Sequence, residues 1–186
     1  MTYGGGVFVA VSYNSSVAAT STDGVNWTAR TMPSIQNWYA VTYGGSTFVA
    51  IAHGPTTVAA SSPDGINWTA RTMPSSQNWV SVAYGSGVFA AVAYGPSNAA
   101  ATSTDGINWT LQTMPSSREW LSVAYGEETF VAVAQGPSNA AATSTDGITW
   151  TERVLPASQN WKSVAYGAGS FVTVASGPTA TAAASP

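Results

Sequence analysis

The four aspartates are the most regularly spaced ionisable residues in the sequence. They recur every 41 residues, each directly before a glycine, as Asp23, Asp64, Asp105 and Asp146. Carboxylates can act as general acids, bases or nucleophiles, and a glycosidase needs two of them on opposite sides of one bond. The other carboxylates have no counterpart 41 residues away: they are Glu119, Glu127, Glu128 and Glu152. The sequence therefore offers no matched catalytic pair.

Other groups that could carry chemistry are equally sparse. His53 is the only histidine and cysteine is absent, which leaves no repeated Ser–His pair, no histidine metal cluster and no thiolate site. A lone histidine in a turn is more often a surface residue. We therefore expect no enzyme activity, no metal and no cofactor.

Charge and composition exclude further classes of protein. Five Lys and Arg against eight Asp and Glu give a net charge of −3, and only 7% of residues are charged. Nucleic-acid binding needs clustered cations, so we expect no such partner. The 45% hydrophobic and 11% aromatic fractions argue against disorder. The start of the sequence shows no signal peptide, and no apolar run reaches the length of a membrane span, about 20 residues. We therefore expect no membrane partner. The location stays open, and a virion and an extracellular location are among the alternatives.

An internal repeat organises the whole chain. Besides the aspartates, two tryptophan series, a Tyr-Gly series and a phenylalanine series keep the 41-residue period. Within one repeat, four stretches have the alternation and composition of strands and are separated by Gly- or Pro-bearing turns; in the third repeat they are 79–85, 88–95, 98–104 and 107–113. We name these strands A, B, C and D. The Asp-Gly dipeptide between C and D predicts a type I′ hairpin, and the Met-Pro-Ser-Ser stretch after D predicts a loop to the next strand A.

Tandem four-stranded units of about 40 residues predict an all-β fold, a β-propeller of antiparallel blades. One such sheet has two apolar faces, and radial stacking buries both. We predict a single domain over residues 1–186, a closed five-bladed ring whose last blade lacks strand D, with blades at approximately 1–32, 33–73, 74–114, 115–155 and 156–186. We favour a monomer; the alternative is an oligomer in which incomplete ends complete each other across chains.

The segment between strands C and D carries a family resemblance. Ser21-Thr22-Asp23-Gly24-Val25-Asn26-Trp27 and its three copies resemble the Asp-box, or BNR repeat, of sialidase-like propellers, with the Trp one position earlier than in the family pattern. The resemblance implies a structural turn on the face opposite the active site. The residues themselves agree, because Asx-type turn chemistry already explains the aspartates without catalysis or metal binding. The structural residues are then Asp23, Trp27, Asp64, Trp68, Asp105, Trp109, Asp146 and Trp150.

The resemblance also implies what a sialidase-like hydrolase would need, namely an arginine triad, a tyrosine and an acid around the central axis. The sequence places its three repeated arginines on strand D, at the outer edge of each blade: Arg30, Arg71 and Arg153. Hydrolase activity is therefore the last of the alternatives.

The connections B–C and D–A emerge on the other propeller face, where Gln-Asn amides adjoin the second tryptophan series. An aromatic platform with flanking amides suits a neutral sugar, which stacks its C–H face and hydrogen-bonds through its hydroxyls, and repetition adds avidity. The structural alternative is that these tryptophans fill the wedges between blades and the amides cap turns. The candidate ligand-binding residues are Gln36, Asn37, Trp38, Gln77, Asn78, Trp79, Trp120, Gln159, Asn160 and Trp161.

Two positions on this face differ among otherwise similar repeats. The position before the B–C turn reads Tyr13, His53, Tyr94, Gln135 and Ser176; the position after the second tryptophan reads Tyr39, Val80, Leu121 and Lys162. This divergence indicates either drift at solvent positions or one specialised pocket.

Three function classes follow from the sequence. The first is a non-enzymatic binding propeller for neutral glycans, either lectin-like or receptor-binding in a phage or surface protein. The second is a ligand-free scaffold, designed or recently amplified, and the third is the hydrolase.

Overall fold

The computed structural model describes residues 1–177 and 181–185, and in them the regular structure is all strand. Fifteen strands follow one another in sheet order as they do in sequence, and every neighbouring pair is antiparallel. They are β1 (Thr2–Gly4), β2 (Val7–Val11), β3 (Ser15–Ser21), β4 (Thr28–Gly44), β5 (Thr47–His53), β6 (Thr56–Ser62), β7 (Thr69–Gly85), β8 (Val88–Tyr94), β9 (Ser97–Ser103), β10 (Thr110–Gly126), β11 (Thr129–Gln135), β12 (Ser138–Ser144), β13 (Thr151–Gly167), β14 (Ser170–Ser176) and β15 (Ala182–Ala184). The predicted all-β class is confirmed.

The predicted loop between strands D and A is wrong. Strand D of one blade and strand A of the next form one continuous 17-residue strand, as in β4, β7, β10 and β13. In β4 the ladder to β3 ends at Gln36 and the ladder to β5 begins at Asn37. Pro33 lies in the stretch without ladder partners, so its missing N–H costs no hydrogen bond while its fixed φ suits an extended chain.

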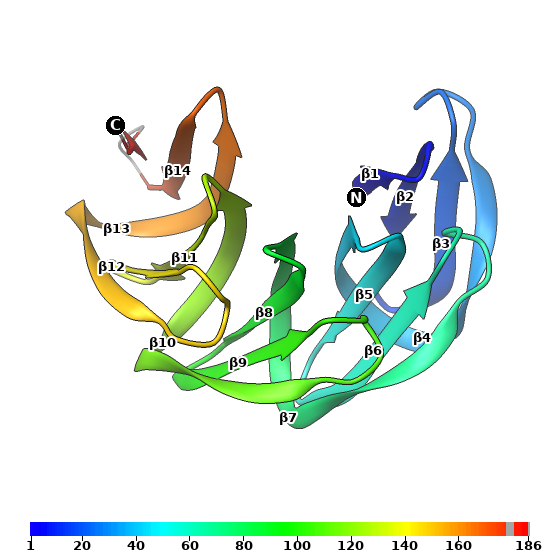
Figure 1. Ribbon diagram of the computed structural model, residues 1–186, viewed down its shortest axis with the longest axis horizontal. Coiled ribbons are helices and arrows are strands. Elements are labelled where there is room, and N and C mark those ends of the chain that lie inside the picture. The colour runs from blue at the N-terminus through cyan, green and yellow to red at the C-terminus, as the bar shows by residue number, and fades with distance from the viewer. Residues whose placement is uncertain (178–180, 186) are drawn as a thin grey trace.

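The ladders divide the strands into five sheets, the last of which contains the second part of β13 with β14 and β15. Figure 1 shows these sheets side by side in an arc, with the N-terminal strands at one end and β14 at the other. The expected closed ring is therefore not observed, because the first and last sheets lie apart on the open side of the arc. None of the described residues forms a helix that could cross a membrane.

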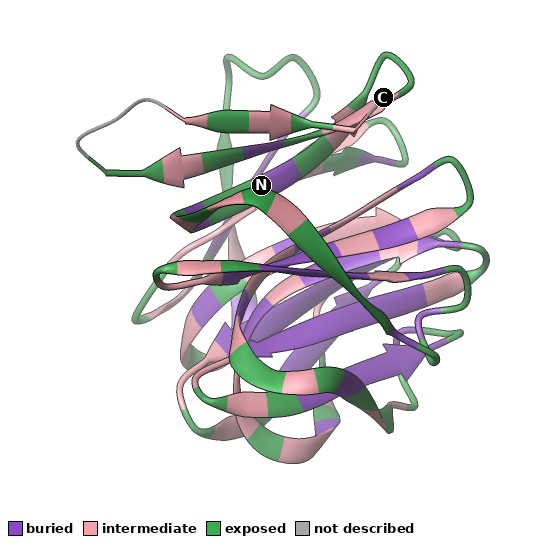
Figure 2. Cartoon of the chain, turned by 90° about the vertical axis from the view of Figure 1, so that its left-hand side faces the viewer, coloured by how far each residue is buried: buried purple, intermediate pink, exposed green. Residues whose placement is uncertain are grey.

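The wedges between sheets are filled by one residue set repeated around the arc. The second tryptophan series and the phenylalanines are almost completely buried there: Trp38, Trp79, Trp120, Trp161, Phe48, Phe89 and Phe130. Small residues on the facing strands, such as Ala90 and Ala132, let the sheets approach closely. Buried residues gather in the middle of the stacked sheets (Figure 2).

A tyrosine–glycine contact links each sheet to the next. The ring of Tyr125 covers Gly85, where an added Cβ would lie 2.0 Å from the ring Cγ. The same contact joins Tyr43 to Gly4, Tyr84 to Gly44 and Tyr166 to Gly126. At the ends of the arc the contact is incomplete: Tyr3 is 59% exposed and no described atom lies within 4 Å of a Cβ built on Gly167.

The Asp-Gly turns are not the type I′ turns that the sequence predicted. The A–B turns, rather than the Asp-Gly turns, have positive φ at both central residues, as type I′ turns require; Gly45 and Ser46 have φ of 52° and 62°. In the Asp-Gly turns only the glycine has positive φ, 70° at Gly106. The connection is longer than a two-residue turn, running from Ser103 to Thr110, and the Asp105 carboxylate accepts bonds from the N–H groups of Ile107 and Asn108 within it.

Candidate functional site: a rim of variable residues

In each Asp-Gly hairpin the aspartate carboxylate accepts hydrogen bonds from the same hairpin. The four hairpins are residues 21–27, 62–68, 103–109 and 144–150. In the first, Ser21 Oγ donates to Asp23 Oδ1 at 2.9 Å, and the backbone N–H groups of Val25 and Asn26 donate to the same oxygen at 2.8 Å. The bond from the Asn26 backbone, followed by those from the Asn26 side chain and Val25, holds the pKa of Asp23 well below its usual range. The same bonds recur in the other copies, so these carboxylates are occupied by turn contacts.

The second tryptophan series does not form a platform on the surface. Trp79, Trp120 and Trp161 are fully buried, and Trp38 is 2% exposed. Each indole Nε1 donates to the carbonyl oxygen four residues earlier, from Trp79 to Ser75 at 3.2 Å for example. The indole faces lie in the wedges between sheets and not on the surface. The structure therefore corrects the expectation that a ligand stacks on Trp38, Trp79, Trp120 and Trp161.

The predicted amides lie next to the B–C turns. Register places Asn37 opposite His53, and Asn78 opposite Tyr94, at the ends of their strands. Ser97 Oγ donates to Gln77 Oε1 at 3.2 Å across the same end of the blade. All the predicted amides are half-buried except Asn160, which is exposed: Gln36, Asn37, Gln77, Asn78, Gln159 and Asn160. They keep polar atoms near the surface, although without the tryptophan faces.

An aromatic cluster stands beside these amides. The His53 ring lies between Tyr39, at 5.3 Å between ring centroids, and Tyr13, at 6.4 Å. Both tyrosines are accessible, with 49% of Tyr39 and 59% of Tyr13 exposed. His53 itself is half-buried, and its buried Nδ1 has no hydrogen-bond partner among the described atoms. An unpaired ring nitrogen next to two accessible aromatic rings is a polar group that a ligand could satisfy.

A second group continues the cluster toward the later blades. The pKa of Tyr94 is raised, mainly by burial and further by the negative charge of Glu119 and a hydrogen bond between the two side chains. Gln135 lies opposite Glu119 in the ladder and accepts a hydrogen bond from Lys162 Nζ at 2.8 Å. We call the whole set the rim: it comprises Tyr13, Tyr39, His53, Tyr94, Glu119, Gln135 and Lys162.

Sequence reasoning listed most of the rim as variable positions but did not select them as a site. The two variable positions are adjacent in space because the residue before the B–C turn pairs near the start of strand A, as Trp38 with Ala52 and Asn37 with His53 show. The sequence alone does not show which residues pair across neighbouring strands, so it could not show that these positions lie together. Within the described residues, no cluster of three His, Asp or Glu side chains could hold a metal ion.

Comparisons with known proteins give the fold. A search of curated proteins finds no significant match. Virginiamycin B lyase from Staphylococcus aureus is similar in structure with a TM-score of 0.73 and 14% sequence identity, over 90% of this chain and 62% of that one. YCF48 bound to D1 peptide has a TM-score of 0.67 at 16% identity, over 92% and 57%. YCF48 from Cyanidioschyzon merolae has a TM-score of 0.58 at 18% identity, over 90% and 64%.

The chain thus spans about three fifths of the length of these structures. At such low identity the likeness concerns the fold alone. The model of the DUF6242 β-propeller domain matches residues 33–161, well over half of the chain. With its successive four-stranded sheets, its wedge packing and this match, the chain belongs to the DUF6242 β-propeller domain family.

Proposed function

We propose that the protein is a non-enzymatic binding module whose rim takes a neutral oligosaccharide. The observation that carries the proposal is the cluster of Tyr13, His53 and Tyr39, two accessible phenol rings around a ring with an unpaired nitrogen. The buried wedges repeat almost unchanged, whereas the rim differs from blade to blade. This contrast favours one specialised site over a repeated one.

The cluster has the groups that recognise a sugar. A pyranose presents apolar C–H faces that stack on aromatic rings and hydroxyls that need directional donors and acceptors. Tyr39 and Tyr13 supply the rings, while the Asn37 amide lies opposite His53 in the ladder. Their hydroxyl, amide and imidazole groups both donate and accept, which matches hydroxyls better than it matches ions.

Charge supports a neutral ligand. The rim contains one cation, Lys162, and its Nζ donates to Gln135 Oε1. Arg118 lies 3.7 Å from Glu152 in an exposed ion pair. An anionic sugar would require clustered, available cations, so sialylated or sulfated glycans are poor candidates.

Isothermal titration calorimetry against a panel of neutral and anionic oligosaccharides tests the proposal. We expect weak binding to a neutral member that changes little between low and high salt, because few ions are released. Tyr39→Ala should weaken it about tenfold or more, by removing a stacking ring. Tyr3→Ala is the matched control, since Tyr3 is similarly exposed but belongs to the A–B side of the first sheet.

Three outcomes would contradict the proposal. Preferential binding of sialylated glycans that collapses with salt would indicate a charged site. The absence of binding to every member would favour a ligand-free scaffold. Turnover of a fluorogenic sialoside by the wild-type chain would contradict the non-enzymatic part.

A further inference from the structure

A series of hydrogen bonds crosses the later part of the rim. Lys162 Nζ donates to Gln135 Oε1 at 2.8 Å. The Tyr94 hydroxyl is hydrogen-bonded to both Gln135 and Glu119, and Glu119 lies opposite Gln135 in the ladder. Because a carboxylate only accepts, the Tyr94 hydroxyl donates to Glu119 and the Gln135 amide donates to Tyr94. The bonds therefore run in one direction, from the Lys162 ammonium to the Glu119 carboxylate, and we call these four residues the polar relay.

The sequence provides the polar relay once. Lys162 is the single lysine of the chain. Glu119 stands where the neighbouring repeats have asparagine, at Asn37, Asn78 and Asn160. The relay crosses from the third sheet to the fifth, through β8, β10, β11 and β13. A carboxylate in place of a neutral amide, close to the only lysine, changes what this part of the rim can bind.

The two charges of the polar relay are not paired with each other. Among the described residues the one ion pair joins Arg118 to Glu152. Lys162 is exposed and has three N–H groups, of which one donates within the relay. Glu119 is half-buried, and its carboxylate has about four acceptor positions, of which the relay uses one. Both ends keep hydrogen-bonding capacity, while their charges cancel.

Two neighbouring hydroxyls of a sugar fit this arrangement. One hydroxyl can donate to the Glu119 carboxylate, and the oxygen of the next hydroxyl can accept from the Lys162 ammonium. Hydrogen bonds to ionised groups are stronger than those between neutral groups, so both bonds favour binding. An ion of either sign would be attracted to one end of the relay and repelled by the other. The relay therefore suits a neutral diol.

The relay adjoins the aromatic cluster of the rim. The charge of Tyr39 is among the causes that raise the pKa of Tyr94, so the two side chains lie within electrostatic reach of each other. Tyr39 is also one of the two accessible rings beside His53. Because the cluster and the relay are on different sheets, a sugar ring stacked in the cluster leaves the relay to other residues of the same oligosaccharide.

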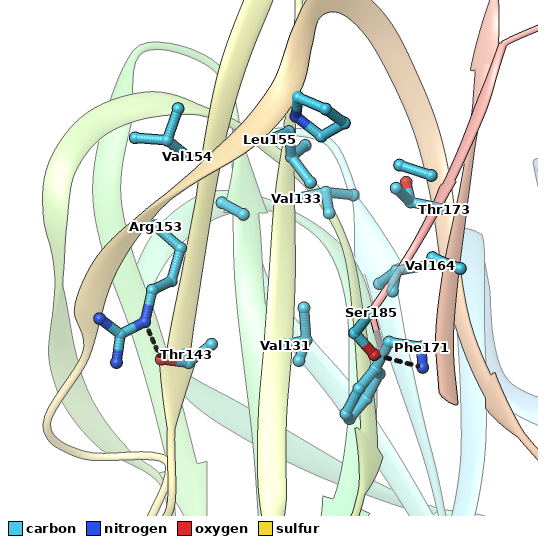
Figure 3. A pocket seen from close by; sticks show the side chains of 14 residues that line it. Val131, Val133, Thr143, Arg153, Val154, Leu155, Val164, Phe171, Thr173 and Ser185 are labelled. Atoms are coloured by element: carbon cyan, nitrogen blue, oxygen red, sulfur yellow. Dashed lines mark hydrogen bonds between the residues drawn. The ribbon is translucent and has the colours of Figure 1, made fainter. Parts of the chain in front are cut away.

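The apolar cavity between the fourth and fifth sheets is a different place. It has a volume of about 250 Å³, and no residue of the polar relay lines it. Figure 3 shows Val131 and Val133 on one side and Phe171 on the other. Arg153 also lines it, and its Nε donates to Thr143 at 3.0 Å. Since most of the lining is aliphatic, the cavity offers few partners to a pair of hydroxyls.

We propose that the polar relay is a second subsite of the glycan site and binds a sugar residue with two neighbouring free hydroxyls. Glu119 accepts from one hydroxyl, and Lys162 donates to the other. The inference rests on the proposed function of the rim and specifies the class of ligand. The oligosaccharide is neutral, has more than one residue, and keeps adjacent hydroxyls unsubstituted beyond the residue that stacks on Tyr39.

The probes are linear oligosaccharides of glucose, mannose and galactose, from the monosaccharide to the hexasaccharide, titrated into the whole chain by calorimetry. For the sugar that binds, affinity should rise about tenfold or more once the oligosaccharide is long enough to reach the relay, because bonds to ionised groups are added to stacking. Methylated forms of the same sugars test the hydroxyls. Since an ether cannot donate to a carboxylate, the methylated hexasaccharide should bind no better than the methylated monosaccharide.

Protein variants locate the second subsite. Glu119→Gln keeps the shape of the side chain but removes its charge, so it should abolish the gain of the hexasaccharide and leave the affinity for the monosaccharide unchanged. Lys162→Met should do the same from the other end of the relay. Glu128→Gln is the matched control, because it is the same substitution in the turn between β10 and β11, away from the relay, and should change neither affinity. Tyr39→Ala should weaken binding of the short and the long sugar alike.

Other outcomes overturn the proposal. Equal affinities for short and long sugars, both reduced by Tyr39→Ala, would remove the second subsite and leave the proposed function intact. A gain with length that survives both Glu119→Gln and Lys162→Met would place the further sugar residues elsewhere. Competition by free glycine, whose ammonium and carboxylate match the two charges, would make the relay a site for a zwitterion. No binding of any probe would overturn the proposed function and the subsite together.

Discussion

A tyrosine ring covers a glycine of the preceding sheet so closely that a Cβ does not fit between them. Gly85→Ala should destabilise the protein by about 1–3 kcal/mol, because the new methyl group would overlap the Tyr125 ring and force it to move. Gly167→Ala is the internal control, since no described atom lies within 4 Å of the added Cβ. Urea denaturation of both variants measures the difference. Equal midpoints would show that the ring does not occupy this position.

The aspartates of the Asp-Gly hairpins make a second residue-scale prediction. Asp105→Ala should lower the free energy of unfolding by about 0.5–2 kcal/mol, through loss of its bonds from Ile107, Asn108 and Ser103. The variant should fold with the same circular dichroism spectrum. If the free energy of unfolding stayed the same while ligand binding disappeared, the aspartate would belong to a functional site instead.

The same bonds make stability depend on pH. The backbone bond from Asn108, the largest favourable cause, holds the pKa of Asp105 below its ordinary value of 3.8, and Asp64 and Asp146 are lowered by equivalent bonds. Since the folded pKa lies below the unfolded one, the stabilisation is fully present above the unfolded value and is lost as the pH falls through the folded value. Thermal unfolding should show constant melting temperatures from pH 7 to about pH 5 and a decline below about pH 4. Asp105→Ala should reduce that decline; an unchanged decline would assign it to other groups.

At the scale of elements, the A–B turns offer a stabilising change. Glu127 and Glu128 both have positive φ, 44° and 55°, whereas blade three has glycine at the second position. Glu128→Gly should raise stability by up to about 1 kcal/mol, because glycine tolerates this conformation. Gly87→Glu in blade three should have the opposite effect. Thermal unfolding of the two variants measures whether each melting temperature rises or falls. A shift of both melting temperatures in the same direction would show that positive φ at this position does not determine the stability.

Much of the element scale was predictable from the sequence. The 41-residue period and the alternation of small and apolar residues predicted four antiparallel strands per repeat, and the structure has them. The D–A connection was missed because Pro33 and its copies suggest a loop, whereas the ladder changes partner there and needs no N–H from proline. For Trp79 the sequence left two roles open, a wedge between blades and a stacking platform, because composition cannot distinguish them; its 0% exposure supports the wedge.

At the scale of the whole molecule, residues in the first and last sheets are more exposed than their equivalents in the inner sheets. Tyr3 is exposed at one end, and Gly167 is uncovered at the other, the two partners of the contact that joins adjacent sheets. Val174 is 46% exposed, while its equivalents Val92 and Val133 are inaccessible. The burial of these positions in the inner sheets therefore depends on a neighbouring sheet.

The central claim is that ligand binding belongs to the rim. A ¹⁵N–¹H correlation spectrum recorded during titration with the best neutral oligosaccharide of the panel tests this claim most directly. The account predicts shifts for Tyr13, Asn37, Tyr39 and His53 and none for the Asp-Gly hairpins at the opposite end of each blade. Shifts centred on Asp23, Asp64 or Asp105, with the rim unaffected, would contradict it.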